Sequence, residues 1–219
     1  MVQSCQACSK KGIRNIEQLD GLCSVCSINV LAYKRYYDAN IPISYWAIEM
    51  DKFAGSPNLL KLYKEIDIKT MYGNGDNYFL VGTAGTGKTT TAANILKLGC
   101  QKNYNCVYTM LSDIVSALTE APYEDRYVAR KELITADFVI IDEVDPRFAP
   151  SEHAADLFGK TLEIILRTRL QNKIPTILVS NSPNPEAMFS GSMKASLGSL
   201  YAGIKVVVAV GKDYRKENK

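Results

Sequence analysis

The sequence lacks the features that would place the chain in a membrane or on a secretory route. No apolar run approaches the roughly 18–20 residues that a membrane-spanning helix needs. Residues 1–8 are polar and lack the apolar segment of a secretory signal. We therefore expect a soluble, cytoplasmic protein without a membrane partner.

Histidine is also scarce, and the net charge is small. The one histidine among the 219 residues, His153, stands at an expected helix start, where a surface position is favoured over metal binding. The formal net charge of +3 indicates little about partners. The segment 212–219 is locally basic, and it either contacts phosphates or forms a solvated chain end.

The six cysteines fall into two groups, and four of them have metal-binding spacing. These four form a Cys-x2-Cys pair, a gap of 14 residues and a second Cys-x2-Cys pair. In a cytoplasmic chain the spacing indicates zinc rather than disulfides, and residues 1–27 are too short to bury a core without such a staple. Four thiolates make a closed, structural site that would present a docking surface for protein or DNA, whereas the alternative is four reduced core cysteines. The predicted zinc ligands are Cys5, Cys8, Cys23 and Cys26, and the remaining Cys100 and Cys106 are expected to be buried apolar residues.

Beyond the cysteine-rich segment, helical and strand patterns alternate, which predicts a doubly wound α/β sheet. The run Phe-Val-Ile-Ile at 138–141 is continuously apolar, as in a buried parallel strand. We divide the chain into a zinc module (1–27), a helical linker region (28–69) and a larger α/β domain (70–219). Aromatic residues of the linker region, namely Tyr33, Tyr36, Tyr37 and Trp46, are expected to pack onto that domain. Strands are predicted at 77–81, 106–110, 138–141, 176–180 and 204–210. Helices are predicted over most of 28–53, with a break at Ile41-Pro42, and at 59–66, 88–99, 113–118 (capped by Ser112), 123–134 and 154–170.

Residues 82–89, Gly-Thr-Ala-Gly-Thr-Gly-Lys-Thr, match the phosphate-binding pattern G-x4-G-K-[ST] between a predicted strand and a predicted helix. Glycines let backbone N–H groups approach phosphate, and the helix N-terminus adds partial positive charge. Lys88 is expected to bridge the β and γ phosphates of ATP, and the Thr89 hydroxyl to coordinate Mg²⁺. The residues predicted to bind nucleotide are Gly82, Thr83, Ala84, Gly85, Thr86, Gly87, Lys88, Thr89 and Thr90.

Three polar residues after later strands complete a predicted hydrolytic site. The strand 138–141 leads into Asp142, a second Mg²⁺ ligand, and Glu143, which would orient and deprotonate the attacking water. Asn181 follows the strand 176–180 and could reach that water or the γ phosphate, although a turn-forming asparagine is the alternative. Asp145 could be a further acid of the site, but a loop carboxylate in solvent is the favoured interpretation. The predicted catalytic residues are Lys88, Asp142, Glu143 and Asn181.

This order of motifs resembles the AAA+ helicase loaders of the DnaC and DnaI type, and the related IstB-like ATP-binding proteins. The resemblance covers roughly residues 36–214. It is carried by Tyr-Asp-Ala-Asn-Ile-Pro-Ile (37–43) followed by Phe53, by Leu-Gln-Asn-Lys-Ile-Pro-Thr-Ile-Leu-Val-Ser-Asn (170–181), and by Ser-Pro-Asn-Pro-Glu (182–186). A cysteine-rich module before the ATPase also looks like the DnaI arrangement.

The resemblance implies a P-loop NTPase fold of the AAA+ (ASCE) type, with a parallel sheet in the order 5-1-4-3-2 and nucleotide between neighbouring subunits. It also implies a replicative hexameric helicase and single-stranded DNA as partners, and either a homo-oligomer or assembly on the partner. In the family the helices between the second and third strands carry a DNA-binding insertion, here about 111–134. Its candidate contacts are Arg126, Arg130 and Lys131, for which a solvated helix face is the alternative.

The sequence departs from the family at the arginine finger. The helix before the last strand usually carries it, but residues 190–204 contain Lys194 and no arginine. Arg167 or Arg169 could serve across an interface. Because a finger is worth about 10³-fold or more in rate, we expect weak hydrolysis without a partner.

The leading hypothesis is therefore an ATP-dependent helicase loader in DNA replication, in which hydrolysis drives release. Two alternatives stay open. One is an IstB-like ATPase that assembles on duplex DNA and regulates a recombinase. The other is a nucleotide-gated adaptor with little hydrolysis.

Overall fold

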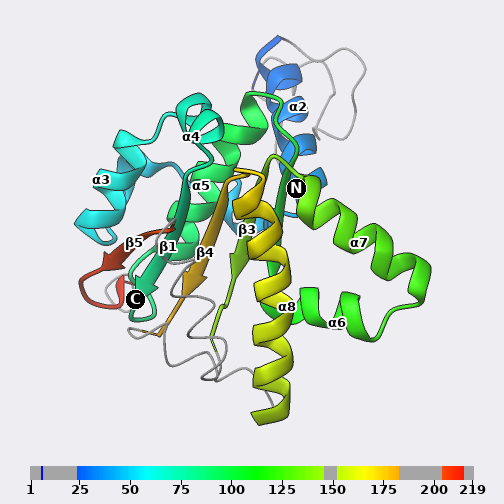
Figure 1. Ribbon diagram of the computed structural model, residues 1–219. Coiled ribbons are helices and arrows are strands. Elements are labelled where there is room, and N and C mark those ends of the chain that lie inside the picture. The colour runs from blue at the N-terminus through cyan, green and yellow to red at the C-terminus, as the bar shows by residue number, and fades with distance from the viewer. Residues whose placement is uncertain (1–5, 7–23, 146–151, 183–203, 215–219) are drawn as a thin grey trace.

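The computed structural model describes residues 6, 24–145, 152–182 and 204–214, and all statements about structure below concern these residues. Five parallel strands form one sheet in the order β2-β3-β4-β1-β5, which confirms the predicted order 5-1-4-3-2 (Figure 1). The strands are β1 (Asn77–Gly82), β2 (Cys106–Met110), β3 (Phe138–Asp142), β4 (Thr176–Ser180) and β5 (Ile204–Ala209).

The central strands are apolar because helices cover both faces of the sheet. Every residue of β1, β3 and β4 is buried. Alternate side chains along β3 enter different cores: Ile140 packs on one face, and Val139 and Ile141 pack on the other. This alternation determines which helix layer each strand-end side chain faces.

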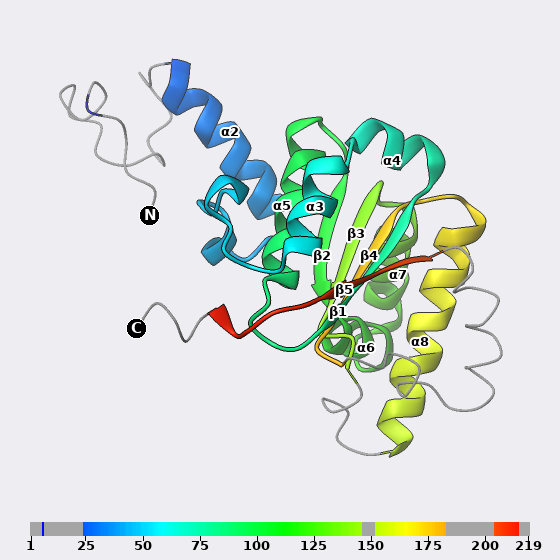
Figure 2. The ribbon, with the colours of Figure 1, turned by 90° about the vertical axis from the view of Figure 1, so that its left-hand side faces the viewer.

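Two helix layers enclose the sheet (Figures 1 and 2). Side chains of α2, α3, α4 and α5 belong to the core on one face, whereas those of α6, α7 and α8 belong to the core on the other. The first layer consists of α2 (Ser24–Asp38), α3 (Pro57–Glu65), α4 (Ile68–Asn74) and α5 (Lys88–Gln101), with the short 3-10 helices η1 (Ile43–Tyr45) and η2 (Met50–Lys52). The second consists of α6 (Leu111–Thr119), α7 (Tyr123–Thr135) and α8 (Glu152–Gln171).

One helix was missed by the sequence analysis, and one helix cap was predicted wrongly. Helix α4 was not predicted, and it begins where the Asp67 side chain accepts a hydrogen bond from the backbone N–H of Thr70 at 2.8 Å. Helix α6 begins at Leu111, so Ser112 lies inside it and is not its cap. The region 28–53 agrees with the prediction of a mostly helical segment broken at Ile41-Pro42: it is helical as far as Asp38 and in two 3-10 turns, and between them the chain turns at Asn40, which has a φ of 55°, before Pro42.

The expected aromatic packing is correct for three of the four residues. The rings of Tyr33 and Trp46 stack with their centroids 5.5 Å apart, and Tyr36 meets both edge-on. Tyr37 instead is 70% exposed. The Lys97 ammonium of α5 donates hydrogen bonds to three backbone carbonyls between residues 45 and 48, at 2.6–3.2 Å. This aromatic cluster and Lys97 together fasten the linker region to the ATPase core.

Two further observations bear on the sequence expectations. Cys100 and Cys106 are buried, as predicted. Among the described residues, no helix combines the length and apolar character needed to cross a bilayer.

Candidate nucleotide-binding site

The residues predicted to bind and hydrolyse ATP lie at one edge of the sheet. Strands β1, β3 and β4 are parallel, and they end at Gly82, Asp142 and Ser180. The phosphate loop follows β1, Glu143 follows β3, and Asn181 follows β4 in a half-buried position. Ligand sites of open α/β sheets lie outside this edge, so the topology brings the predicted catalytic residues together.

The phosphate loop leads directly into α5. Gly85 and Gly87 have φ values of 78° and 91°, in the left-handed region that favours glycine. Lys88 begins the helix and is only 3% exposed. Its ammonium donates to the Thr83 carbonyl at 2.6 Å, and Thr86 closes the loop by donating its hydroxyl to the same oxygen at 2.9 Å. A cation is therefore held inside a loop at a helix N-terminus, which is an arrangement suited to phosphate.

Segments outside the motif brace the loop, and the sequence analysis did not assign them this role. The backbone N–H of Ser56 donates to the Thr86 carbonyl at 3.0 Å, and the Ser56 hydroxyl accepts from the N–H of Val210 at 3.0 Å. The Phe53 ring lies so close to Gly87 that a Cβ there would stand 2.5 Å from ring carbons. The N–H of Tyr214 donates to the Gly85 carbonyl at 3.2 Å.

Asp142 is buried and firmly held. Its Oδ1 accepts a hydrogen bond from the backbone N–H of Glu143 at 2.7 Å, and its Oδ2 accepts from the Tyr108 hydroxyl at 2.6 Å. Asp142 lies two residues after Ile140 on the same strand, so both side chains are on the same face of the sheet. Ile140 packs in the core that contains α5. The Asp142 carboxylate therefore faces the helix that begins with Lys88 and Thr89. The sequence analysis missed Tyr108, and the only signal was its hydroxyl in a mostly apolar strand, which Thr109 makes unspecific.

Glu143 is exposed and has a φ of 53°, which turns the chain sharply after β3. Partial desolvation raises the pKa of its carboxyl, and the negative charges of Asp142 and Asp113 raise it further. A carboxylate with a raised pKa is a stronger base, which suits a residue that takes a proton from water.

One expectation about this loop was wrong. Asp145 was interpreted as a carboxylate in solvent, but it is 1% exposed. The backbone explains the burial, because the N–H of Val144 bonds to the Val179 carbonyl at 2.9 Å and draws the chain back against β4.

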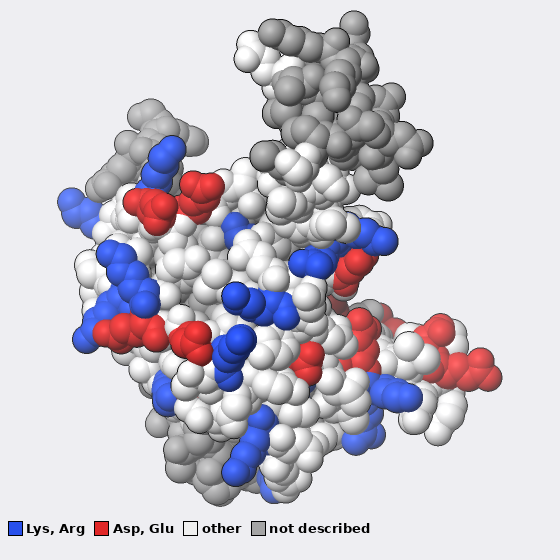
Figure 3. Space-filling view, turned by 90° about the horizontal axis from the view of Figure 1, so that it is seen from above, with Lys and Arg blue, Asp and Glu red and all other residues white. Residues whose placement is uncertain are grey.

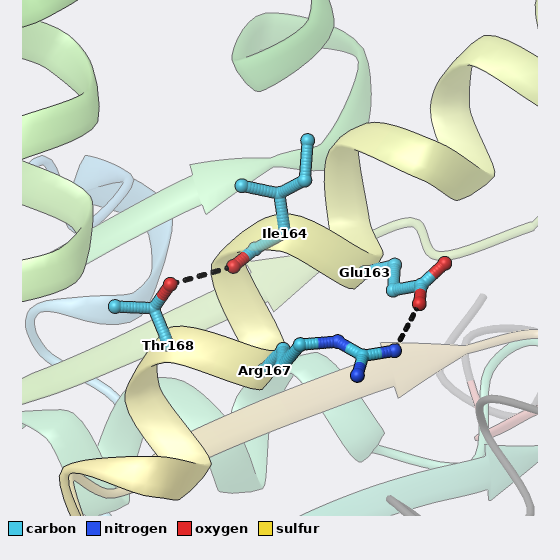
Figure 4. Close-up of polar contacts among 4 residues, drawn as sticks. All are labelled: Glu163, Ile164, Arg167 and Thr168. Atoms are coloured by element: carbon cyan, nitrogen blue, oxygen red, sulfur yellow. Dashed lines mark hydrogen bonds and ion pairs between the residues drawn. The ribbon is translucent and has the colours of Figure 1, made fainter.

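The two candidate arginine fingers, Arg167 and Arg169, differ in their exposure to solvent. Arg169 is fully buried, and its guanidinium donates to the carbonyls of Leu133, Ala136 and Pro175 and to the Thr176 hydroxyl. It therefore cannot reach a neighbouring subunit, and its proposed finger role is wrong. Arg167 lies on the outside of α8, half exposed, with its guanidinium 2.5 Å from Glu163 one helical turn away (Figure 4).

The predicted zinc site lies mostly outside the described residues. Cys5, Cys8 and Cys23 are not among them, whereas Cys26 is buried in α2. The part of the chain that the structure describes contains no group of three or more potential metal ligands. The side chains of His153 and Lys194 also lie outside it, so these assignments stay predictions.

The predicted DNA contacts lie on α7, which forms a hairpin with α6 beside the sheet (Figure 1). A surface cavity of about 340 Å³ between α6, α7 and α8 is lined by Arg126, Arg130 and two exposed tyrosines, Tyr123 and Tyr127. On the side of the molecule opposite the carboxyl ends of the strands, basic and acidic side chains are interspersed (Figure 3). The described residues of that side therefore offer nucleic acid no extended basic surface.

The residues present fit ATP with Mg²⁺. The loop offers backbone N–H groups and a buried ammonium to phosphate, and the Thr89 hydroxyl and the Asp142 carboxylate are the hard oxygen ligands that Mg²⁺ prefers. The half-buried Thr89 lies one residue into α5, on the layer that Asp142 faces.

Comparisons with known proteins agree with this geometry. The sequence model of the family described as IstB-like ATP binding protein matches residues 61–219. No curated protein matches the chain. Among solved structures, the DnaC helicase loader is similar with a TM-score of 0.57 and 16% identity, over 77% of this chain and 99% of that one. DnaI is similar with a TM-score of 0.57 and 13% identity, over 79% and 93%.

Replication initiators have the same fold. DnaA bound to AMPPCP and single-stranded DNA is similar with a TM-score of 0.61 and 18% identity, over 78% of this chain and 51% of that one. The chain thus spans about half the length of the initiators it matches.

Proposed function

Because the chain belongs to the IstB-like ATP-binding protein family, we propose that it binds ATP with Mg²⁺ at the phosphate loop and hydrolyses it slowly. One observation carries the proposal: the Lys88 ammonium is held inside the loop, on the helix layer that the buried Asp142 carboxylate faces. A positive charge for phosphate and a carboxylate for a divalent cation are the two parts that phosphoryl transfer requires of such a site.

Each predicted residue has a role in this proposal. The N–H groups of residues 82–90 hold the phosphates, and Lys88 turns from the Thr83 carbonyl to the β and γ phosphates. Thr89 and Asp142 would hold Mg²⁺, which when bound neutralises charge that develops on the phosphates. Glu143, whose pKa is raised, accepts the proton of the attacking water, and Asn181 orients that water.

Hydrolysis by the isolated chain is expected to be weak. The Arg169 guanidinium is bonded to backbone carbonyls in the core, and Arg167 is paired with Glu163 on the surface of its own subunit. Neither of these two described arginines stabilises the γ phosphate of its own subunit, and we propose that a group from another molecule, either a second copy of the chain or a protein partner, does so. Arg167 of an adjacent copy is the candidate within this sequence, because an exposed i,i+4 pair costs little to break.

The proposed biological role is loading of a replicative hexameric helicase onto single-stranded DNA, with hydrolysis driving release. Two of the similar solved structures, DnaC and DnaI, are matched over nearly their whole length, and the first of them is a helicase loader. Exposed tyrosines beside Arg130 and Lys131 on α7 supply stacking surfaces and positive charge, which suit unpaired bases and phosphates. A zinc module at residues 1–27 would present a docking surface for the helicase or for DNA.

The test is a pull-down with the Glu143→Gln variant, which should bind ATP without turning it over. With ATP and Mg²⁺ it should retain a hexameric helicase and single-stranded DNA, and the Lys88→Ala variant should retain neither. Absence of both partners from the ATP-bound protein would refute the loading role while leaving ATP binding intact.

The surface on α7 can be tested separately. Charge reversal at Arg130 and Lys131 should weaken single-stranded DNA binding in a fluorescence anisotropy titration. Charge reversal at Lys61 and Lys64, two exposed residues of α3 on the other side of the sheet, is the matched control and should have little effect. Equal weakening by both changes would indicate non-specific electrostatics.

Two other functions have particular support. The matching family model favours an IstB-like ATPase that regulates a recombinase, and ATP-dependent filaments on duplex DNA would establish it. Arg169 is buried and bonded to core carbonyls, so it cannot act as an arginine finger, which favours a nucleotide-gated adaptor with little hydrolysis. Robust turnover by the isolated protein, abolished in Glu143→Gln, would exclude the adaptor.

A further inference from the structure

Tyr108 is a buried residue of β2 whose hydroxyl lies beneath the predicted magnesium site. It donates a hydrogen bond to Asp142 Oδ2 at 2.6 Å, from a strand that pairs with β3 in parallel. In the register of the two strands Tyr108 lies opposite Ile140, two residues before Asp142 on the same face. The phenol therefore reaches diagonally along the sheet to the strand end.

The contact restricts the Asp142 carboxylate in a particular way. One oxygen accepts from the N–H of Glu143, just after β3, and the other from the hydroxyl of Tyr108, in the middle of β2, so two donors from different segments set the plane of the carboxylate. Each carboxylate oxygen can accept two hydrogen bonds, so each keeps a lone pair for a cation or its water shell. Rotation of the carboxylate would break at least one of these two bonds.

Tyr108 is itself well placed to act as a fixed donor. Its backbone N–H bonds to the Ala39 carbonyl at 2.8 Å, which holds the edge strand against the segment after α2.

We propose that Tyr108 is a positioning residue, which orients the Asp142 carboxylate for Mg²⁺ bound with ATP. The inference rests on the proposed function, because it assigns Asp142 to the cation. Groups that hydrogen-bond a metal ligand from behind typically change metal affinity about 10–100-fold when they are removed. Loss of the hydroxyl should therefore weaken the response to Mg²⁺ and leave the phosphate loop unaltered.

The competing explanation is an ordinary core tyrosine that has found a partner for its hydroxyl. Tyr36 is a suitable comparison, because it is also buried and its hydroxyl accepts a single side-chain hydrogen bond, from Gln101 at 2.8 Å. That bond joins α2 to α5 away from the carboxylate. Tyr108→Phe and Tyr36→Phe thus each remove one buried hydroxyl and one hydrogen bond.

The experiment measures binding of a fluorescent ATP analogue, first with chelator and then as Mg²⁺ is added. We expect wild type, Tyr108→Phe and Tyr36→Phe to bind equally without Mg²⁺. The half-saturating Mg²⁺ concentration should then rise about tenfold in Tyr108→Phe alone. Thermal unfolding establishes that each variant is folded, and Tyr108→Met, which also lacks the hydroxyl, replaces Tyr108→Phe if that variant is not.

Failures of the two proposals look different. A wild-type chain that binds ATP without any response to Mg²⁺ would overturn the proposed magnesium site, and this inference with it. A wild-type response that Tyr108→Phe shares, or a shift that Tyr36→Phe reproduces, would overturn only the positioning role of Tyr108.

Discussion

Replacing Arg169 tests the conclusion that this arginine is structural. In Arg169→Met the apolar stem is largely kept, but the guanidinium that serves the carbonyls of Leu133, Ala136 and Pro175 is lost. A buried polar group left without a partner costs about 1–3 kcal/mol. Three such carbonyls, with some relaxation and water entry, predict a loss of about 3–5 kcal/mol in the free energy of unfolding, much of the stability of an ordinary domain.

The assay is urea unfolding followed by circular dichroism, with Arg167→Met as the matched control. Arg167 lies two residues away on the same helix, and its exposed pair with Glu163 is worth about 0.3–0.5 kcal/mol. We expect Arg169→Met to unfold at much lower urea and Arg167→Met to unfold near wild type. If Arg169→Met were within about 1 kcal/mol of wild type but lost partner-stimulated hydrolysis, the burial argument would be refuted and a finger role restored.

Three other changes test separate parts of the site. Gly85→Ala should weaken ATP binding about tenfold or more in a titration, because a Cβ would overlap the Asp213 carboxylate and lie 2.9 Å from Asp213 Cα at a φ of 78°; Asp213→Ala should restore only part of the loss. The rate of hydrolysis should fall as the pH drops through the raised pKa of Glu143, above the ordinary value of 4.5, since only the carboxylate can accept a proton. If the residual activity of Glu143→Gln showed the same fall at low pH, the fall would belong to another group. Cys23→Ser should release zinc without changing ATP binding, whereas stoichiometric metal in that variant would contradict the four-cysteine assignment.

The strands and the phosphate loop could be predicted from the sequence because their signals are local. The apolar run at 138–141 and the glycine-rich motif at 82–89 each carry their own structural meaning. Strand boundaries consequently agreed within a residue. The sheet order followed from the resemblance, because no local pattern specifies which strands are neighbours.

Burial of polar side chains could not be predicted in the same way. Asp145 and Arg169 belong to residue types that are mostly exposed, and the sequence contains no sign that nearby backbone groups would enclose them. The Arg169 guanidinium bonds Leu133 and Ala136, more than 30 residues away along the chain, so its role depends on tertiary packing alone. The same holds for Tyr108 and Asp142, which a strand pairing joins across 34 positions.

A phosphate-binding motif predicts what the loop can bind, but residues outside the motif determine its shape. Ser56 joins the Thr86 carbonyl to the N–H of Val210, so one serine connects the segment before the ATPase core, the loop and the end of β5. Tyr214 bonds the loop from the C-terminal side at Gly85. A partner that moved either flanking segment would therefore alter the loop without touching the nucleotide. This connection offers a physical route by which binding of another protein could change nucleotide affinity, and by linkage nucleotide would change the affinity for that protein equally.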